Sequence, residues 1–154
     1  MHRLENRIPP PLVASLLGLL MWLAARQLQG GLALTIEWRI GVGLAVLLVG
    51  VVICLAGVLS FHHARTTVNP LKPETASALV SSGIYRYTRN PMYLGFATVL
   101  VAWSIFLAWP PALLGVLGFV LYMNRFQIAP EERALTKLFG DDFAQYCNRV
   151  RRWI

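Results

Sequence analysis

Two long segments without charged residues constrain this chain more than any other feature. Residues 40–61 form one uncharged run of 22 residues, and residues 94–123 form another of 30. An α-helix rises about 1.5 Å per residue, so about 20 such residues cross a hydrocarbon core of about 30 Å. A bilayer core offers no water to bond the backbone, so these segments are expected to be transmembrane helices.

The composition supports a membrane protein along the whole length. The chain has 154 residues, of which 56% are hydrophobic and 14% are charged. Soluble domains carry about 25% charged residues, and a chain of this length is expected to form one domain. The net charge of +7 is scattered between apolar segments. This distribution argues against nucleic acid as a partner and indicates cationic loops that meet membrane lipids.

We expect an all-α integral membrane protein with about four transmembrane helices and a short helical C-terminal tail. The predicted spans are residues 11–28, 40–61, 91–109 and 111–128, with a loop at 62–90 and a tail at 129–154. The pair Pro110-Pro111 is expected to separate the last two spans, because proline lacks a backbone donor and disfavours helix before it. The alternative is one kinked helix.

The distribution of basic residues predicts the orientation. With both termini in the cytoplasm, twelve of the 14 basic residues lie on that side, and only Arg26 and Arg39 lie outside. The positive-inside rule therefore places the loop and the tail on the cytoplasmic face of a multi-pass protein, as in a bacterial inner membrane. Arg3 and Arg7 before the apolar residues 12–25 also resemble a signal peptide. We favour retention of this segment as the first span.

Two patterns bear on packing. Gly43, Gly50 and Gly57 are seven residues apart and lie on one face of the second span, where they favour close helix contact. In the tail, Pro130 is expected to start a helix that Gly140 ends, and a second short helix is expected to follow.

The polar residues that could carry chemistry gather in two places. Residues 83–95 contain two arginines, three tyrosines and a proline immediately before an apolar run, and Glu131-Glu132 follows the last apolar run. Alternatively, these residues are interfacial charges, an aromatic belt and helix-start acids. Neither the cysteines nor His62 and His63 show metal-ligand spacing, so no metal site is expected. No nucleophile–base pair is evident, and no residue is assigned an acid–base role.

Both places carry recognisable motifs. The first motif includes Leu79-Val80-Ser81-Ser82-Gly83-Ile84-Tyr85 and Arg89-Asn90-Pro91-Met92-Tyr93-Leu94-Gly95, and the second is Glu131-Glu132-Arg133-Ala134-Leu135. Together they resemble the isoprenylcysteine carboxyl methyltransferase and phospholipid methyltransferase superfamily over residues 60–152.

The resemblance implies an S-adenosylmethionine-dependent methyltransferase. The implied cofactor-binding residues are Ser77, Ala78, Leu79, Val80, Tyr85, Arg89, Asn90, Pro91, Met92, Tyr93, Glu131 and Glu132. Glu131, with Glu132, is expected to bind the cationic end of the cofactor, and Arg89 to pair with its carboxylate or to brace the loop. Asn90 stands where the family commonly has histidine and cannot titrate near neutrality.

The implied substrate is a lipophilic or membrane-embedded acceptor with a carboxylate, thiol or amine nucleophile. Arg125 and Gln127 are the candidate substrate-binding residues, and Gln127 stands where the prenylcysteine branch has an arginine. This departure disfavours a prenylcysteine carboxylate. The rival interpretations are an NADPH-dependent membrane reductase of the sterol-reductase type and a non-enzymatic scaffold. The sequence does not indicate the oligomeric state.

Overall fold

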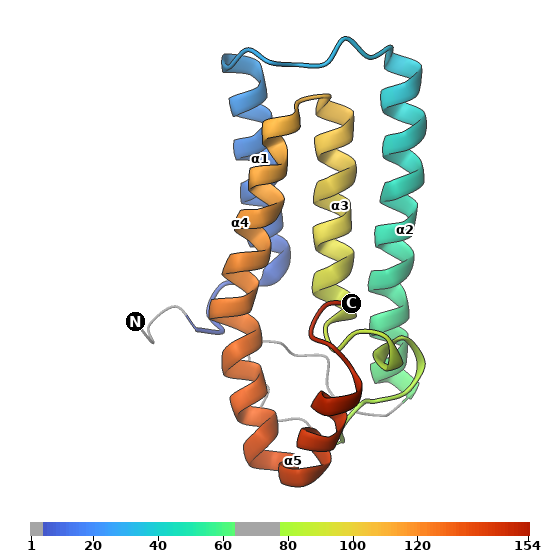
Figure 1. Ribbon diagram of the computed structural model, residues 1–154, viewed down its shortest axis with the longest axis vertical. Helices are drawn as coiled ribbons and strands as arrows, with labels where there is room; N and C mark the ends of the chain where they lie inside the picture. Colours follow the sequence, from blue (N-terminus) through green and yellow to red (C-terminus); the bar gives the residue numbers. More distant parts are fainter. Residues whose placement is uncertain (1–4, 64–77) are drawn as a thin grey trace.

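The computed structural model describes residues 5–63 and 78–154, and these residues form helices without any strand (Figure 1). The elements are α1 (Pro10–Gln27), α2 (Ile36–His63), the short η3 (Gly83–Arg86), α3 (Pro91–Leu107), η4 (Pro110–Ala112), α4 (Leu113–Met123), η5 (Asn124–Ile128) and α5 (Ala129–Arg149).

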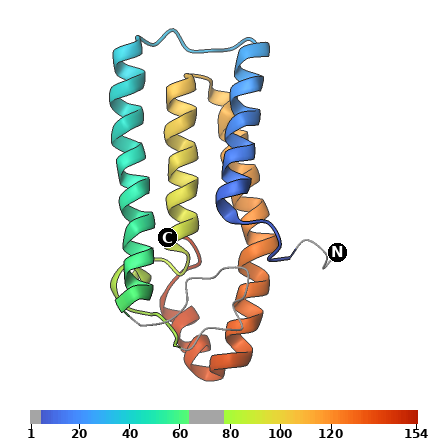
Figure 2. The ribbon, with the colours of Figure 1, turned by 180° about the vertical axis from the view of Figure 1, so that it is seen from behind.

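The long helices form a bundle in which α3 lies between α2 and the pair α1 and α4 (Figures 1 and 2). The α1–α2 connection and the α3–α4 turn lie at one end of the bundle. At the other end, η3, α5 and residues 150–154 gather around the N-terminus of α3. The polar motifs therefore meet at one end of an apolar bundle.

The outer surface of the bundle is suited to lipid. Large apolar side chains of α1 and α2 point outward, among them Leu16 at 56%, Leu48 at 63% and Val52 at 63% exposure. Soluble proteins rarely expose contiguous apolar surface on this scale. The helices Ile36–His62 and Pro110–Arg149 are long and apolar enough to cross a membrane, and α3 is a shorter apolar helix. These observations confirm the predicted all-α integral membrane fold.

Glycines bring α2 and α3 into backbone contact. A Cβ atom on Gly95 would lie 2.8 Å from the carbonyl oxygen of Gly50 and 3.0 Å from the amide nitrogen of Cys54. A Cβ atom on Gly57 would lie 3.0 Å from Cγ of Met92. The predicted packing role of the glycines in the second span is confirmed, and Gly57 lets α2 approach the start of α3.

The predicted break between the third and fourth apolar segments is also confirmed. The helix α3 ends at Leu107, and Ala108 adopts a left-handed conformation with φ of 50° before Pro110 begins η4. The α1–α2 connection covers this turn, since the amide of Leu32 donates to the carbonyl of Ala108 at 2.7 Å. The alternative of one kinked helix is therefore wrong.

The predicted separation between the fourth span and the tail is wrong. Helix runs without a gap through α4, η5 and α5, and η5 is a π-helical turn. Pro130 lacks the N–H that would bond to the carbonyl of Phe126, and a wider turn relieves the clash of its ring with that carbonyl. The amide of Asn6 donates to the Phe126 carbonyl instead, at 3.0 Å. The predicted helix end at Gly140 is observed as a kink with φ of 50°.

Candidate active site

The loop before α3 is built on a small apolar cluster. Val80 and Tyr85 are buried together with Phe143, Tyr146 and Val150. The hydroxyl of Tyr146 donates to the carbonyl of Tyr85 at 2.7 Å. Burial raises the pKa of both phenols, so each stays neutral near pH 7. The cluster anchors the end of the loop to α5.

Residues 150–153, which we call the strap, fasten the last residues of this loop. The amide of Arg89 donates to the carbonyl of Arg151 at 3.0 Å. The side-chain amide of Asn90 donates to the carbonyl of Arg152 at 2.9 Å, and the buried Thr88 hydroxyl donates to the same carbonyl at 3.4 Å. The indole of Trp153 then donates to the Asn124 side chain at 3.0 Å. The strap thus joins the loop to the π-helical turn.

Glu132 lies between two guanidinium groups. Nη2 of Arg89 lies 3.0 Å from Oε1 of Glu132, and Nε of Arg152 donates to the same oxygen at 3.1 Å. Nη2 of Arg152 also contacts the second carboxylate oxygen. The charge of Glu132 is therefore compensated within the protein, and this ion-pair network ties the loop, the strap and the start of α5 together.

Glu131 lies in a different environment. The hydroxyl of Tyr93 donates to Oε2 of Glu131 at 3.1 Å, and in the described part of the chain no cationic side chain forms an ion pair with this carboxylate. Part of the side chain stays accessible, yet the surrounding protein desolvates the carboxyl group. Desolvation, opposed by the Tyr93 hydrogen bond and reinforced by the charge of Glu132, raises the pKa of Glu131 to about 7. Glu131 is therefore a desolvated carboxyl group that has no cationic partner among the described residues.

The fold brings most of the candidate cofactor residues to one place. Arg89, Asn90, Pro91, Met92 and Tyr93 lead into α3 beside Glu131 and Glu132. Val80 and Tyr85 form the buried base of the adjoining loop. Ala78 and Leu79 are half-buried just before it, and Ser77 lies outside the described residues. Of the two expected roles of Arg89, bracing the loop matches the contacts observed. Binding of a cofactor by this set remains a prediction.

The two candidate substrate residues face the N-terminal segment. Arg125 is exposed and pairs with Glu5 at 3.0 Å, and Arg133 pairs with the same carboxylate. Gln127 is fully buried in the π-helical turn and donates from Nε2 to the carbonyl of Ile8 at 2.8 Å. A substrate contact by either residue stays a prediction.

Sequence reasoning missed the strap and Thr88. Arg152 belongs to the basic run near the end of the chain, which the positive-inside rule explains without any further role. Thr88 caps the turn, where the amide of Asn90 donates to its hydroxyl oxygen at 3.1 Å. A threonine two residues before the N-cap residue Asn90 is the only signal that could have indicated this contact.

Comparison with known sequences identifies the family. The sequence profile of the phospholipid methyltransferase family matches residues 38–142, which include most of α2, all of α3 and α4, and both polar motifs. The chain belongs to the phospholipid methyltransferase family.

Several curated proteins resemble the chain. Protein-S-isoprenylcysteine O-methyltransferase A of Arabidopsis thaliana is 30% identical over 141 residues, which cover 90% of this chain and 70% of that protein. A probable protein-S-isoprenylcysteine O-methyltransferase of Oryza sativa subsp. indica is 31% identical over 112 residues, 71% of this chain and 57% of that protein. Methanethiol S-methyltransferase 1 of Bradyrhizobium diazoefficiens is 36% identical over 67 residues, 44% of this chain and 22% of that protein. No solved structure matches the chain.

Proposed function

We propose that this protein transfers a methyl group from S-adenosylmethionine to a lipophilic acceptor held in the membrane. Membership of the family and the methyltransferase names of the relatives support methyl transfer. The observation that carries the choice of cofactor is the contrast between the two adjacent carboxylates. Two arginines neutralise Glu132, whereas among the described residues Glu131 has the neutral phenol of Tyr93 as its side-chain partner and no cation.

The residues present fit a cationic cofactor. S-adenosylmethionine supplies an electrophilic methyl group on a sulfonium and carries an ammonium group. A desolvated carboxylate binds a cation strongly, because the interaction is poorly screened. We assign Glu131 to this role and assign Tyr85, Asn90, Pro91, Met92 and Tyr93 to the wall of the same pocket. Arg89 and Glu132 hold the pocket together, and of the arginines described at this end, Arg89 and Arg152 are already paired with Glu132 rather than free for the phosphates of a nicotinamide cofactor.

The chain contributes placement and exclusion of water to the reaction. In-line displacement requires the nucleophile to lie behind the methyl carbon, and such alignment contributes about 7–11 kcal/mol in well-oriented systems. The phenols of Tyr85 and Tyr146 are neutral and cannot serve as bases. A carboxylate or thiolate acceptor needs no base, whereas an amine acceptor must lose its proton first. Acceptors of the first two kinds agree with the relatives' names, protein-S-isoprenylcysteine O-methyltransferase and methanethiol S-methyltransferase.

Calorimetric titration of S-adenosylmethionine into detergent-purified protein tests the proposal. We expect saturable binding that Glu131→Gln abolishes and that Asp142→Asn, an equal charge change at an exposed position of α5, leaves intact. NADPH is titrated in parallel. Absence of S-adenosylmethionine binding by folded wild-type protein contradicts the proposal. Saturable NADPH binding in its place supports the alternative interpretation, an NADPH-dependent membrane reductase.

A further inference from the structure

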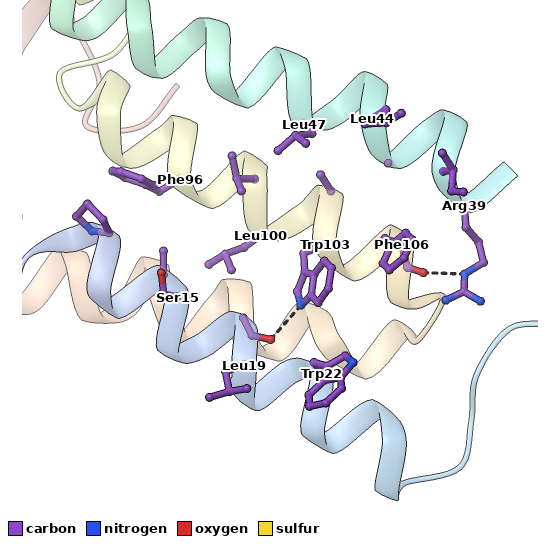
Figure 3. A pocket seen from close by; sticks show the side chains of 17 residues that line it. Ser15, Leu19, Trp22, Arg39, Leu44, Leu47, Phe96, Leu100, Trp103 and Phe106 are labelled. Atoms are coloured by element: carbon purple, nitrogen blue, oxygen red, sulfur yellow. Dashed lines mark hydrogen bonds between the residues drawn. The ribbon is translucent and has the colours of Figure 1, made fainter. Parts of the chain in front are cut away.

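An apolar groove runs along α3 between α1 and α2. Side chains from all three helices line it, among them Leu19, Leu47 and Leu100 (Figure 3). The groove has a volume of about 710 Å³. Among the described residues that line it, Ser15 carries a hydroxyl and Arg39 a charge, and the other side chains are aliphatic or aromatic. The groove lies on lipid-facing helices and none of its lining residues belongs to the site around Glu131.

The walls of the groove contain few polar groups that need a hydrogen-bond partner. The indole N–H of Trp103 donates to the carbonyl of Gly18 at 2.9 Å, so this polar group is already satisfied (Figure 3). Apolar cavities do not hold water, because water needs two to four polar partners. On the surface of a membrane protein, the material that fills such a groove is hydrocarbon.

Two cations flank one end of the groove, near the α1–α2 connection. Nε of Arg39 on α2 donates to the carbonyl of Phe106 at 2.7 Å, and its guanidinium lies 5.5 Å from the centre of the Phe106 ring. On α1, the guanidinium of Arg26 lies 4.7 Å from the centre of the Trp22 ring. Phe106 and Trp22 both line the groove. Each arginine is thus held against a wall of the groove by an aromatic ring.

Arg39 retains donors for an external partner. A guanidinium has five N–H donors, and the contact with Phe106 uses one of them. In the described ranges 5–63 and 78–154, no carboxylate lies within ion-pair distance of Arg39. A cation at the edge of a hydrocarbon layer is costly unless it meets an anion or the headgroup region. Phosphate matches the geometry of a guanidinium and binds it with two hydrogen bonds.

We infer that this groove binds one phospholipid molecule, with an acyl chain along α3 and the phosphate on Arg39. The lipid comes from the leaflet at the α1–α2 end of the bundle. It is not the methyl acceptor, because Arg39 lies near the start of α2, beside the α1–α2 connection, whereas Glu131 lies in α5 at the other end of the bundle (Figure 1). Its role is to fill the space between α1 and α2 and to hold both helices against α3. The inference does not depend on methyl transfer.

Native mass spectrometry and thermal unfolding in detergent test the headgroup assignment, with dioleoyl phosphatidylglycerol and dioleoylglycerol as probes. The two probes share their chains and differ in the phosphate-bearing headgroup. We expect one phosphatidylglycerol per protein, a rise in melting temperature, and about tenfold weaker retention of dioleoylglycerol, the size of one charge-assisted contact. Arg39→Gln is expected to abolish the difference. A preference that persists in Arg39→Gln overturns the assignment of the phosphate to Arg39.

A matched pair of substitutions tests the groove. Leu44 lines the groove and is 52% exposed, whereas Leu48 lies one turn further along α2, outside the groove, and is 63% exposed. Both side chains face the membrane side of the helix, so tryptophan is sterically tolerated at either position. We expect Leu44→Trp to lower phospholipid retention and Leu48→Trp to leave it unchanged. Equal retention by the two variants, or lipid bound without saturation, shows annular lipid only and overturns the proposal.

Discussion

At the scale of single residues, two neighbouring glutamates have opposite surroundings. Glu132 compensates Arg89 and Arg152, and so it contributes to the stability of the fold. Glu131 is desolvated and forms no ion pair with any cation in the described ranges, and so its charged form opposes folding. Desolvated charged groups of this kind are typical of binding sites, where an unfavourable charge is kept because a ligand needs it.

The first prediction concerns the stability of Glu131→Gln as a function of pH. The pKa of Glu131 is raised from 4.5 to about 7 in the folded protein, so between these values the folded state holds a proton that the unfolded chain has released. The resulting contribution to stability is complete below pH 4.5 and is lost as the pH rises through about 7. Glu131→Gln should therefore melt a few degrees above wild type at pH 8 and at the same temperature at pH 4, where both folded and unfolded wild type hold the proton. Thermal unfolding of both proteins measures the difference, and a variant less stable than wild type at pH 8 contradicts this account.

The second prediction concerns Arg152, which donates to both oxygens of Glu132. Arg152→Gln leaves Glu132 with Arg89 alone and should lower the free energy of unfolding by about 1 kcal/mol, since the pair is partly exposed. It should also weaken S-adenosylmethionine binding, because the strap fixes Asn90. Arg151→Gln is the control, since Arg151 bonds to Arg89 through its backbone carbonyl and its exposed side chain forms no ion pair with the described residues. Calorimetry should show partial recovery of S-adenosylmethionine binding in Arg152→Lys. Equal losses of binding in Arg151→Gln and Arg152→Gln would show that Arg152 does not position the site.

At the scale of elements, the contact between α2 and α3 depends on the absence of side chains. A Cβ atom at Gly95 would meet backbone atoms of α2 at 2.8 and 3.0 Å, and backbone cannot move aside as a flexible side chain can. The separation of these helices also sets the position of Tyr93, two residues before Gly95 on α3. Helix packing and site geometry are therefore coupled.

The third prediction compares two glycines. Gly95→Ala should destabilise the protein by about 1–3 kcal/mol, the usual cost of overpacking. Gly41→Ala on α2, where the added Cβ meets nothing within 4 Å, should be neutral or slightly stabilising because alanine favours helix. Unfolding in a denaturing detergent measures both variants. Similar stabilities would show that α2 and α3 are not in the close contact described.

At the scale of the whole molecule, the bundle separates a polar end from an apolar body. The candidate site and both ends of the described chain segment 78–154 lie at the end away from the α1–α2 connection (Figure 1). The excess of basic residues at this end predicts that it faces the cytoplasm.

Labelling of cysteines with a membrane-impermeant reagent tests this orientation. Cys147 on α5 should stay unlabelled in intact bacterial cells that express the protein and become labelled after lysis. Gln29→Cys, in the exposed α1–α2 connection, should be labelled before lysis. The opposite pattern of labelling would show that the protein is inserted the other way round.

The sequence by itself determined the membrane class, the four apolar helices, the break at the prolines and the two polar motifs. These features depend on length, hydropathy and local backbone chemistry, which are properties of short segments. Only the tertiary structure decided that Glu132 is neutralised while Glu131 is not, because Arg152 reaches Glu132 from 20 residues away. It also decided that α4 continues into α5, since the carbonyl that Pro130 leaves without its helical donor is satisfied by Asn6, far away in the chain. Contacts between distant segments depend on how helices pack, and no local pattern in the sequence encodes them.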